Sequence, residues 1–291
     1  MDKKKILIQL DSDPQPSVFD RVVAIDAGAD EVFSYGGIRP EQVRDIVHGA
    51  IFTRGPKDLK STAIFIGGSD VAEGEKLLEE ARRHMLPQFG LRVSVLLDAN
   101  GANTTAAAAI RAATRHVDLL KDGPPLVLGG TGPVGQRIAR VLARHGSRVR
   151  VGSRQHSRAA KVCDDIRTNV PSALLEPFAT GASSELQAAL KGCTLVFAAG
   201  AAGAVLLPRA DRASCPPLKL AIDLNAVPPL GIEGVEVSDM GKERDGVICY
   251  GAIGVGDTKM KIHKAAIAKL FESNDQIMDA EEVYALATSI A

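Results

Sequence analysis

A glycine-rich turn between an apolar run and a helical run is the feature that most constrains this chain. The segment Gly129-Gly130-Thr131-Gly132-Pro133-Val134-Gly135 follows the run LVL and opens the helical stretch Val134–Ala143. Gly130, Gly132 and Gly135 have the spacing G-x-G-x-x-G, in which glycine allows a tight turn, close approach of the backbone to a pyrophosphate, and close packing of helix on strand. The helix N-terminus adds free N–H groups and the positive end of its dipole. The pattern predicts a dinucleotide-binding domain of Rossmann type; the alternative is a glycine-rich turn without a ligand.

The residues after the next predicted strand, 148–151, indicate which dinucleotide binds. An NAD site places Asp or Glu ~20 residues beyond the glycines, where it accepts from the ribose 2′-hydroxyl. This chain has Ser153, Arg154 and Arg158 there, and its first carboxylate is Asp164. A hydroxyl and two guanidinium groups suit a 2′-phosphate, which a carboxylate would repel. We therefore expect NADP, with NAD bound more weakly; the alternative is that both arginines are solvated surface residues.

Two further loops are expected to face the same cofactor. One begins with Ala199 and Gly200 after the run LVFA, and the other begins with Asn225 after the run KLAIDL. Ligands of doubly wound sheets bind beyond the carboxyl ends of the strands, which is where both loops lie. Ordinary tight turns would account for the same small residues.

Short β-rich runs alternate with amphipathic helical stretches, and this pattern predicts parallel sheets with crossover helices. The break Lys121-Asp122-Gly123-Pro124-Pro125 predicts a domain boundary. The fold class is two α/β domains: an N-terminal substrate domain, 1–121, a Rossmann-type doubly wound parallel sheet, 122–257, and C-terminal helices, 258–291, that complete the N-terminal domain. The predicted strands are 5–10, 31–34, 63–66, 92–97, 126–128, 148–151, 194–198, 218–224 and 247–250. The predicted helices include 104–117, with Asn103 as its N-cap, and 258–271. The second of these follows a predicted second crossing between the domains near Gly254.

Charge and composition exclude several classes of protein. Lys plus Arg and Asp plus Glu both number 35, so no overall field attracts a polyanion, and the aromatic content of 4% without Trp disfavours base stacking. The four cysteines are far apart in the sequence, which disfavours zinc sites and disulfide scaffolds. We expect a cytoplasmic protein that binds no metal, no nucleic acid and no membrane.

Polar groups gather where the predicted strands of the first domain end. The segment 11–20 follows KILIQL, the segment 98–105 follows RVSVLL, and the segment 53–57 precedes AIFI. Asp, Asn, Ser and Thr are also the ordinary residues of caps and turns. These segments therefore indicate a substrate side without identifying the substrate.

Several long strings in these same segments resemble those of a known family. The chain is similar over nearly its full length to the bacterial methylene-tetrahydromethanopterin and methylene-tetrahydrofolate dehydrogenases. The strings are PSVFD (16–20), TRG (53–55) with STAIF (61–65), NTTAA (103–107), GTGPVG (130–135), NAVPPLGI (225–232), KMKIH (259–263) and AKLFE (268–272). The resemblance implies an NADP-linked homo-oligomer of two-domain subunits that binds a reduced pterin in the interdomain cleft, with the C-terminal helices rejoining the first domain.

The resemblance also implies roles for individual residues. Asp20 would hold the donor edge of the pterin and favour developing positive charge, and Lys259 would orient a pterin carbonyl. The implied substrate-binding residues are Ser17, Phe19, Arg54, Asn103, Thr104 and Thr105. Each has a plainer alternative, since Asp20 lies at capping distance from Ser17 and Lys259 suits a solvated helix face. His263 is expected to be packed or exposed and not catalytic, because the implied chemistry moves no proton.

Four readings of the function remain open at this point. The first is NADP-dependent oxidation of methylene-tetrahydromethanopterin in one-carbon metabolism, and the second is the same reaction with tetrahydrofolate as main or additional carrier. The third is a shikimate-type alcohol dehydrogenase, with Lys57 or Asp98 as general base. The fourth is a non-catalytic dinucleotide sensor. The methylene-tetrahydrofolate dehydrogenases that also hydrolyse the methenyl product use a Tyr-x-x-x-Lys pair in their site. This chain lacks the pair, because the residues four positions after its three tyrosines are Arg39, Gly254 and Thr288. We therefore expect no cyclohydrolase activity.

Overall fold

The computed structural model describes residues 3–290, which divide into two compact units. One unit contains the described residues up to Thr104 together with those from Met260 onward, and the other is Thr105–Lys259. Each unit is built on a mainly parallel sheet with crossover helices, which confirms the α/β fold class. The sequence places the first boundary at Lys121–Asp122, whereas this division falls inside the continuous helix α4 (Ala102–Ala113).

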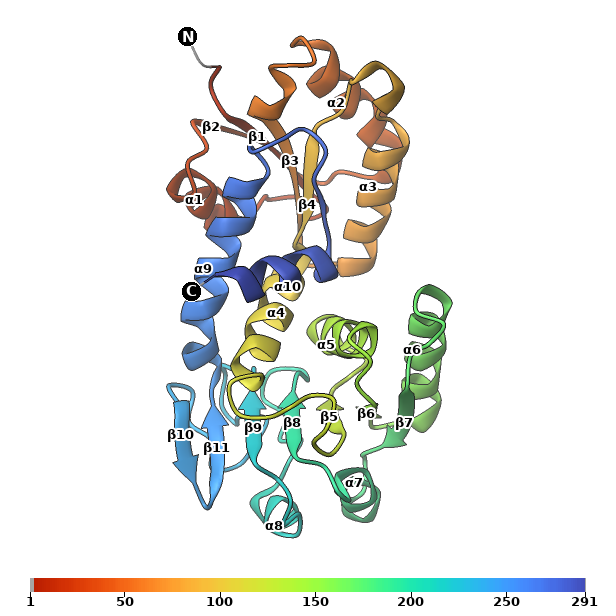
Figure 1. Cartoon of the computed structure of the whole chain (residues 1–291), viewed down its shortest axis with the longest axis vertical. Helices are drawn as coiled ribbons and strands as arrows, with labels where there is room; N and C mark the ends of the chain where they lie inside the picture. Colours follow the sequence, from red (N-terminus) through yellow and green to blue (C-terminus); the bar gives the residue numbers. More distant parts are fainter. Residues whose placement is uncertain (1–2, 291) are drawn as a thin grey trace. The chain divides into compact units, whose positions relative to one another are not determined.

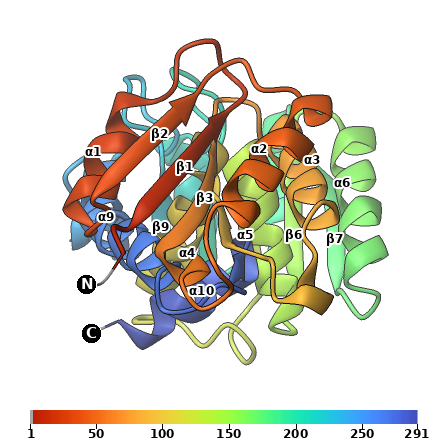
Figure 2. The same cartoon turned by 90° about the horizontal axis from the view of Figure 1, so that it is seen from above.

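The first unit has a five-stranded parallel sheet in the order β12-β4-β3-β1-β2 (Figure 1). Its strands are β1 (Ile6–Asp11), β2 (Glu31–Tyr35), β3 (Thr62–Gly67), β4 (Ser94–Leu97) and β12 (Ile277–Met278). Its helices are α1 (Val18–Asp26), α2 (Pro40–Phe52), α3 (Val71–Arg83) and α10 (Ala280–Ser289). Every residue of β3 and β4 is buried, as continuous apolar runs between two helical layers require. Seen from above, β2 forms the outer edge of this sheet (Figure 2).

The second unit has a seven-stranded sheet in the order β10-β11-β9-β8-β5-β6-β7. Its strands are β5 (Pro125–Leu128), β6 (Val149–Ser153), β7 (Leu175–Ala179), β8 (Leu195–Ala198), β9 (Leu220–Asp223), β10 (Met240–Arg244) and β11 (Val247–Tyr250). Its helices include α5 (Pro133–Arg144), α6 (His156–Asn169), α7 (Ser183–Leu190) and α8 (Arg209–Ala213). Counted along the chain, the six parallel strands have the Rossmann order 3-2-1-4-5-6, so the strand order reverses between β5 and β8.

Three strands lie outside the sequence prediction, each for a local reason. β7 contains Pro177, which lowers strand propensity, and β10 reads MGKER and is largely exposed. β12 has only two residues and exists because it pairs with β4. The prediction that Asn103 caps the alanine-rich helix was wrong, because α4 begins at Ala102. The Asp98 carboxylate accepts the amides of Asn103 and Thr104 instead, each at 3.0 Å.

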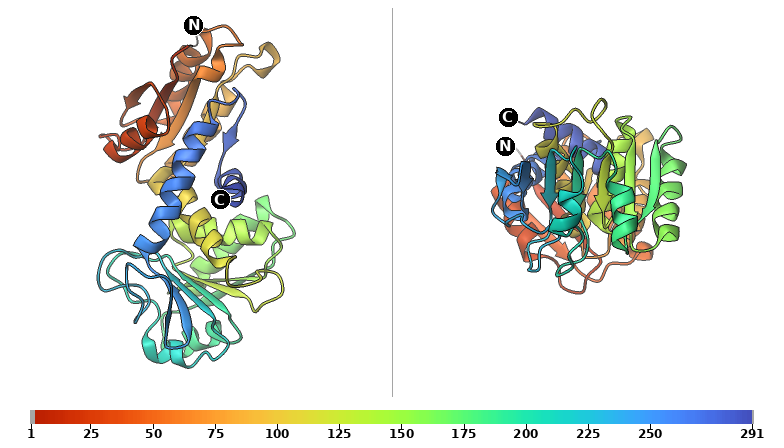
Figure 3. Two further views of the ribbon diagram at one scale, coloured as in Figure 1. Left: turned by 60° about the vertical axis from the view of Figure 1, so that its left-hand side comes forward. Right: turned by 90° about the horizontal axis from the view of Figure 1, so that it is seen from below.

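Helix α9 (Ala252–Lys269) begins earlier than the predicted Thr258 and is continuous (Figure 3). The glycines read from sequence as a crossing lie in its first turns. A Cβ at Gly254 would overlap the carbonyl oxygen of Asp239, and one at Gly251 would overlap that of Glu236. Glycine at these positions therefore allows the start of α9 to lie directly on the main chain before β10.

The core contains all four cysteines. Cys163, Cys193, Cys215 and Cys249 are buried, and burial raises the pKa of Cys163 and of Cys249 to about 11. The thiols are therefore protonated at neutral pH and unsuited to nucleophilic chemistry. Within residues 3–290, every helix is too short or too polar to cross a bilayer.

The contact at the start of α9 gives a testable prediction about stability. Gly254→Ala should lower the free energy of unfolding by ~3 kcal/mol, because the new methyl group overlaps backbone that cannot rotate away. Gly256→Ala in the same helix meets nothing within 4 Å and should raise stability by ~0.5 kcal/mol. Thermal unfolding midpoints of the two variants test this; equal midpoints would contradict the contact.

Candidate functional site

The glycine turn after β5 lies at the point where the strand order of the second sheet reverses. Its left-handed residue is Gly129, with φ of 67°, which precedes the first glycine of the motif. A Cβ at Gly129 would lie 2.5 Å from the Cα of Gly200 in the loop after β8. A Cβ at Gly130 would lie 2.7 Å from Val151, and one at Gly135 would lie 2.6 Å from the Gly129 carbonyl oxygen. These glycines are required by packing within the protein.

Gly132 differs from its neighbours. A Cβ there would meet only the carbonyl oxygens of Ala199 and Gly129, at 3.3 and 3.4 Å, which small shifts would relieve. Gly132 is also the N-cap of α5, and no side chain caps this helix. The first intrahelical bond runs from Gln136 N to Gly132 O at 3.0 Å, so the amides of Val134 and Gly135 precede the helical ladder. The bare Cα and these donors fit a pyrophosphate.

The end of β6 carries the groups predicted to select the dinucleotide. Ser153 is buried at the last position of β6. Arg154 is exposed on the turn before α6, and Arg158 is exposed in the first turn of α6. The N-cap of α6 is Gln155, whose side chain makes no capping hydrogen bond. Two guanidinium groups therefore flank an uncapped helix N-terminus, an arrangement that suits a phosphate.

The loops after β8 and β9 lie at the same end of the second sheet as the glycine turn after β5. Ala199 N donates to Leu128 O at 2.9 Å, and a Cβ at Gly200 would lie 2.7 Å from Leu206. Asn225 Nδ2 donates to Ala201 O at 3.1 Å, which ties the two loops together. Asp223 is fully buried at the end of β9, and its carboxylate accepts from Asn225 N and Ile232 N at 3.0 and 2.8 Å. Burial raises the pKa of Asp223, against these backbone hydrogen bonds, which lower it. Sequence reasoning missed Asp223, although its place at the end of KLAIDL was visible.

In the first unit, the Ser17 side chain caps α1, and the Asp20 side chain does not complete a capping box. Ser17 Oγ accepts from Asp20 N at 3.2 Å, as their spacing predicts. In a capping box the Asp20 side chain would accept a hydrogen bond from the Ser17 amide. That amide donates to Asp11 Oδ2 instead, at 3.1 Å. The Asp20 carboxylate lies instead over Gly67, where a Cβ would be 3.5 Å from its Oδ2. The carboxylate is thus presented at the carboxyl ends of β1 and β3.

His263 of α9 faces Asp20. Its Nε2 lies 4.0 Å from Asp20 Oδ1, and its ring stacks on Phe65 with centroids 5.7 Å apart. The side chain of His263 is 1% exposed, so of the two alternatives left open by the sequence, packed or exposed, the structure has the packed one. Phe19, half exposed on α1, lies 6.2 Å from the same ring between centroids. The structure therefore brings Ser17, Phe19 and Asp20 together, and adds Asp11 and His263, which sequence reasoning had not placed in the site.

Lys259 lies one turn before His263 on α9. Residues four apart in a helix share a face, so Lys259 is on the face of α9 that carries His263. Lys259 is partly buried and Lys261 is exposed. This difference favours Lys259 over Lys261 as the cation with a specific role.

The start of α4 is held by Asp98. Thr104 is fully buried, and its hydroxyl donates to Asp98 Oδ2 at 2.7 Å. Asn103 Nδ2 donates to Leu97 O at 2.7 Å and to Asp279 Oδ1 at 2.9 Å. Both predicted substrate ligands thus have structural partners, while Thr105 is partly exposed. The role of Asp98 was missed, although its place directly after a predicted strand was visible.

Arg54 lies at the other end of the same sheet. Its Nη1 donates to Lys4 O at 3.0 Å and to Ser61 O at 2.7 Å, and these residues precede β1 and β3. The structure therefore does not bring Arg54 together with Asp20. It assigns Arg54 to bridging the amino-terminal ends of two strands.

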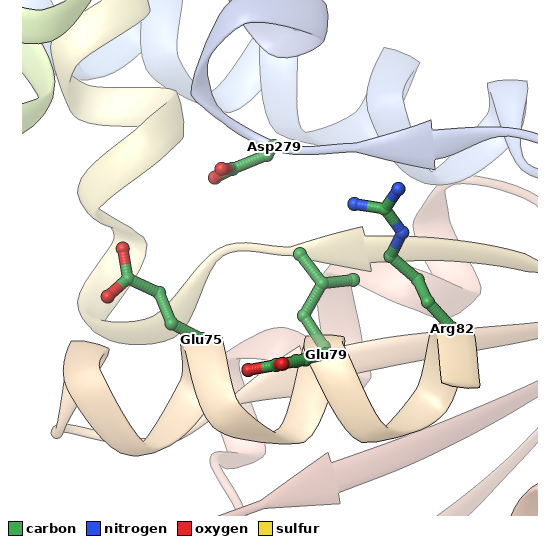
Figure 4. Close-up of a pocket in the computed structure, with 5 residues that line it drawn as sticks. Glu75, Glu79, Arg82 and Asp279 are labelled. Atoms are coloured by element: carbon green, nitrogen blue, oxygen red, sulfur yellow. The ribbon is translucent and has the colours of Figure 1, made fainter. Parts of the chain in front are cut away.

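A shallow pocket of about 230 Å³ lies between α3 and the start of α10 (Figure 4). Its lining residues are Glu75, Leu78, Glu79, Arg82 and Asp279. Three carboxylates against one guanidinium would repel a phosphate, so the pocket does not suit a dinucleotide. Asp279 accepts from Asn103, which indicates that this place anchors α10 beside α4.

Comparison with known proteins identifies the family. Residues 18–100 match the family described as methylene-tetrahydromethanopterin dehydrogenase, N-terminal. The chain is 43% identical to the bifunctional protein MdtA of Methylorubrum extorquens, over 99% of both chains. It is 30% identical to the NAD(P)-dependent methylenetetrahydromethanopterin dehydrogenase of that organism, over 94% of this chain and 95% of the relative.

The chain belongs to the methylene-tetrahydromethanopterin dehydrogenase family. Among solved structures, shikimate 5-dehydrogenase from Listeria monocytogenes is similar with a TM-score of 0.54 and 15% identity, covering 97% of this chain and 96% of that one. A likeness at that identity shows a shared fold alone. The two curated relatives thus confirm the family resemblance found in the sequence.

In this family member, the segment matched by the N-terminal description begins at the first residue of α1. It contains Phe19, Asp20 and Arg54, and it ends before Asn103. Among the described residues of the dehydrogenase, no group of three or more His, Cys, Asp or Glu side chains is arranged to hold a metal ion.

The contrast between Gly132 and Gly135 gives a test of the dinucleotide site. Gly132→Ala should leave the thermal midpoint nearly unchanged and weaken dinucleotide binding ~10-fold or more, because the methyl group occupies the place of the pyrophosphate. Gly135→Ala should lower the midpoint, because its methyl group meets backbone at 2.6 Å. Calorimetric titration and thermal unfolding separate the two effects. Unchanged binding to the Gly132 variant would remove the turn from the site.

Proposed function

We propose that this protein oxidises N5,N10-methylene-tetrahydromethanopterin to the methenyl form and passes the hydride to NADP. The supporting observation is the similarity over 94% of the chain to a relative whose name states this substrate and an NAD(P) cofactor. The bare Gly132 at an uncapped helix N-terminus gives independent support for the dinucleotide.

The reaction needs alignment more than proton transfer. Hydride loss from the methylene bridge leaves an amidinium-like cation, which the two flanking nitrogens of the pterin stabilise. No proton moves in that step, so no acid–base pair is required. NADP, when bound, supplies the hydride acceptor. The protein contributes orientation of the reacting groups, exclusion of water and a suitable electrostatic setting.

Asp20 is our candidate for the electrostatic part of that task. Its carboxylate does not complete a capping box and lies at the carboxyl ends of β1 and β3, and its side chain is 16% exposed. A carboxylate in this setting stabilises positive charge developing on a bound pterin. Lys259 would orient a pterin carbonyl. An ammonium near a forming cation costs energy, which Asp20 offsets.

The choice of NADP rests on the end of β6. Arg154 and Arg158 flank the uncapped start of α6, and no Asp or Glu precedes Asp164 after this strand. A 2′-phosphate gains charge-assisted hydrogen bonds from the guanidinium groups and meets no repelling carboxylate there.

The competing functions receive less support. Both curated relatives cited above are similar over nearly the full chain, and the one named for its reaction is named for methanopterin, so tetrahydrofolate is not favoured as the main carrier. Shikimate oxidation needs a general base. The two candidates for this base are Asp98 and Lys57. The Asp98 carboxylate is engaged as acceptor of hydrogen bonds from Asn103 and Thr104, and Lys57 is exposed on the loop before β3. We further propose a cytoplasmic homo-oligomer without nucleic-acid or membrane partners and without cyclohydrolase activity.

An activity assay with three substrates tests the proposal. Purified enzyme with NADP is mixed with formaldehyde and tetrahydromethanopterin, with formaldehyde and tetrahydrofolate, or with shikimate, and reduced nicotinamide is followed by absorbance. The highest kcat/KM is expected with methylene-tetrahydromethanopterin, and its methenyl product should hydrolyse no faster than without enzyme. Turnover with shikimate alone would overturn the proposal, as would NADP binding without turnover of any pterin.

Arg154→Ala tests the cofactor preference. Loss of a charge-assisted bond to the 2′-phosphate should raise KM for NADP ~10-fold to ~100-fold and leave KM for NAD nearly unchanged. Arg148, which lies at the opposite end of β6 near Glu176, gives the control variant Arg148→Ala. Equal effects of Arg154→Ala on both cofactors would exclude the phosphate role.

Asp20→Asn tests the electrostatic role. The variant should fold and bind NADP normally, while kcat falls ~100-fold because the neutral amide no longer stabilises the cationic product. Asp26→Asn on the same helix is the control, because Asp26 is exposed and pairs with Lys264 at 2.8 Å. If both variants keep the kcat of the parent protein, Asp20 does not belong to the site.

A further inference from the structure

Helix α1 carries Asp20, yet little apolar packing fixes this helix in place. Of its nine residues, Val23 and Ala24 are the buried ones, and the apolar residues Val22 and Ile25 are each more than half exposed. A helix this short is marginal by itself in water, and two small buried side chains contribute little apolar area to its packing. The position of Asp20 therefore depends on further contacts of α1.

Ser17, which precedes α1, has all of its polar groups hydrogen-bonded. Its amide donates to Asp11 Oδ2 at 3.1 Å, its carbonyl oxygen accepts from Gln9 Nε2 at 3.4 Å, and its hydroxyl accepts from Asp20 N at 3.2 Å. Gln9 and Asp11 are two positions apart on β1, so both side chains lie on the same face of the sheet. β1 thus binds both main-chain groups of Ser17, and the Ser17 side chain binds the main chain of Asp20.

Gln9 is an unusual residue for the middle of a buried strand. It is 1% exposed and lies between the buried apolar residues Ile8 and Leu10. Burial of an amide costs free energy unless its oxygen and nitrogen are both hydrogen-bonded. The Gln9 Oε1 accepts from Ser34 Oγ at 2.7 Å, and Ser34 is the register partner of Gln9 on β2. Because Ser34 takes the oxygen of the amide, the nitrogen donates to Ser17 O.

The place of the Asp20 carboxylate matters because electrostatic stabilisation of a cation depends on distance and direction. A Cβ at Gly67 would lie 3.5 Å from Asp20 Oδ2, so the carboxylate reaches the carboxyl end of β3. Functional groups need placement within ~0.5 Å, which requires that surrounding contacts fix the segment that carries them. The hydrogen bonds from β1 through Ser17 are contacts of this kind.

We propose that Gln9 is a positioning residue for oxidation of the methylene bridge. Through Ser17 it fixes the first turn of α1, and so it keeps the Asp20 carboxylate where it stabilises the cationic product. This inference rests on the proposed function. Gln9 is buried beneath α1 and acts without touching the pterin. An apolar side chain of the same length would suit a buried strand equally well, whereas the amide supplies the link to Ser17.

Amide hydrogen exchange tests the link to α1 without an activity assay. Gln9→Met keeps the length of the side chain and removes both of its hydrogen bonds. The amides of Asp20 and Arg21 should then exchange ~10-fold faster, because the first turn of α1 opens more often. Ser94→Ala is the matched control and should leave these amides unchanged. Ser94 is fully buried on β4, which β3 separates from β1, and its hydroxyl donates to Ser273 O at 3.0 Å. Unchanged exchange in Gln9→Met would overturn the proposal, as would the same increase in both variants.

A double-mutant cycle on kcat tests whether Gln9 acts through Asp20. Gln9→Met should lower kcat for methylene-tetrahydromethanopterin ~10-fold and leave KM for NADP unchanged, because a misplaced carboxylate stabilises the cation less well. In the Asp20→Asn background the same change should lower kcat by less than ~2-fold, since the group through which Gln9 acts is already neutral. Equal factors in the two backgrounds, or an unchanged kcat in Gln9→Met, would refute the positioning role.

Failure of the proposed function would give a different result. A parent protein without pterin turnover, or an Asp20→Asn variant with the kcat of the parent, would overturn that function and with it the effect of Gln9 on the reaction. The exchange rates of the α1 amides would still show whether Gln9 fixes the helix. The two experiments together therefore separate the structural link from its consequence for the reaction.

Discussion

Direct contact between main chains at the point where the second sheet reverses its strand order is the constraint on which the rest of the structure depends. The loops after β5 and β8 meet at Gly129 and Gly200, where a single Cβ would come within 2.5 Å of the opposite backbone. Gly135 lets α5 lie against the same turn. Because no side chains separate these segments, the first amides of α5 stay at the surface of the turn. A helix N-terminus left bare in this way suits a phosphate.

Buried aspartates organise the loops on both sheets in the same way. Asp11 and Asp223 end their strands, and Asp98 directly follows its strand. Asp11 and Asp223 accept amides of the loop that follows, and Asp98 accepts amides of the first turn of α4, so donors that have left the sheet are satisfied. In the first unit Asp11 accepts the amide of Ser17, which the Asp20 side chain would accept in a capping box.

Local features of the site could be predicted from the sequence, and features that depend on distant contacts could not. The glycine spacing and the arginines after β6 are local, so the turn and its helix lie where the pattern placed them. Arg54 lies away from Asp20 because it donates to Ser61 O and to Lys4 O, and the contact with Lys4, fifty positions away, could not be predicted from the residues near Arg54. β12 has two residues and is a strand only because β4 is beside it. The sequence left open whether His263 is packed or exposed, because its position facing Asp20 depends on how α9 returns to the first sheet.

The glycines at the start of α9 fix more than stability. Gly251 and Gly254 lie directly on the carbonyl groups of Glu236 and Asp239, and no side chains intervene that could rearrange. The start of α9 is therefore held against sliding along the main chain before β10. Lys259 is five residues beyond Gly254, ~7.5 Å along the helix axis. The position of the Lys259 backbone along the helix axis is therefore set by the contact at Gly251 and Gly254.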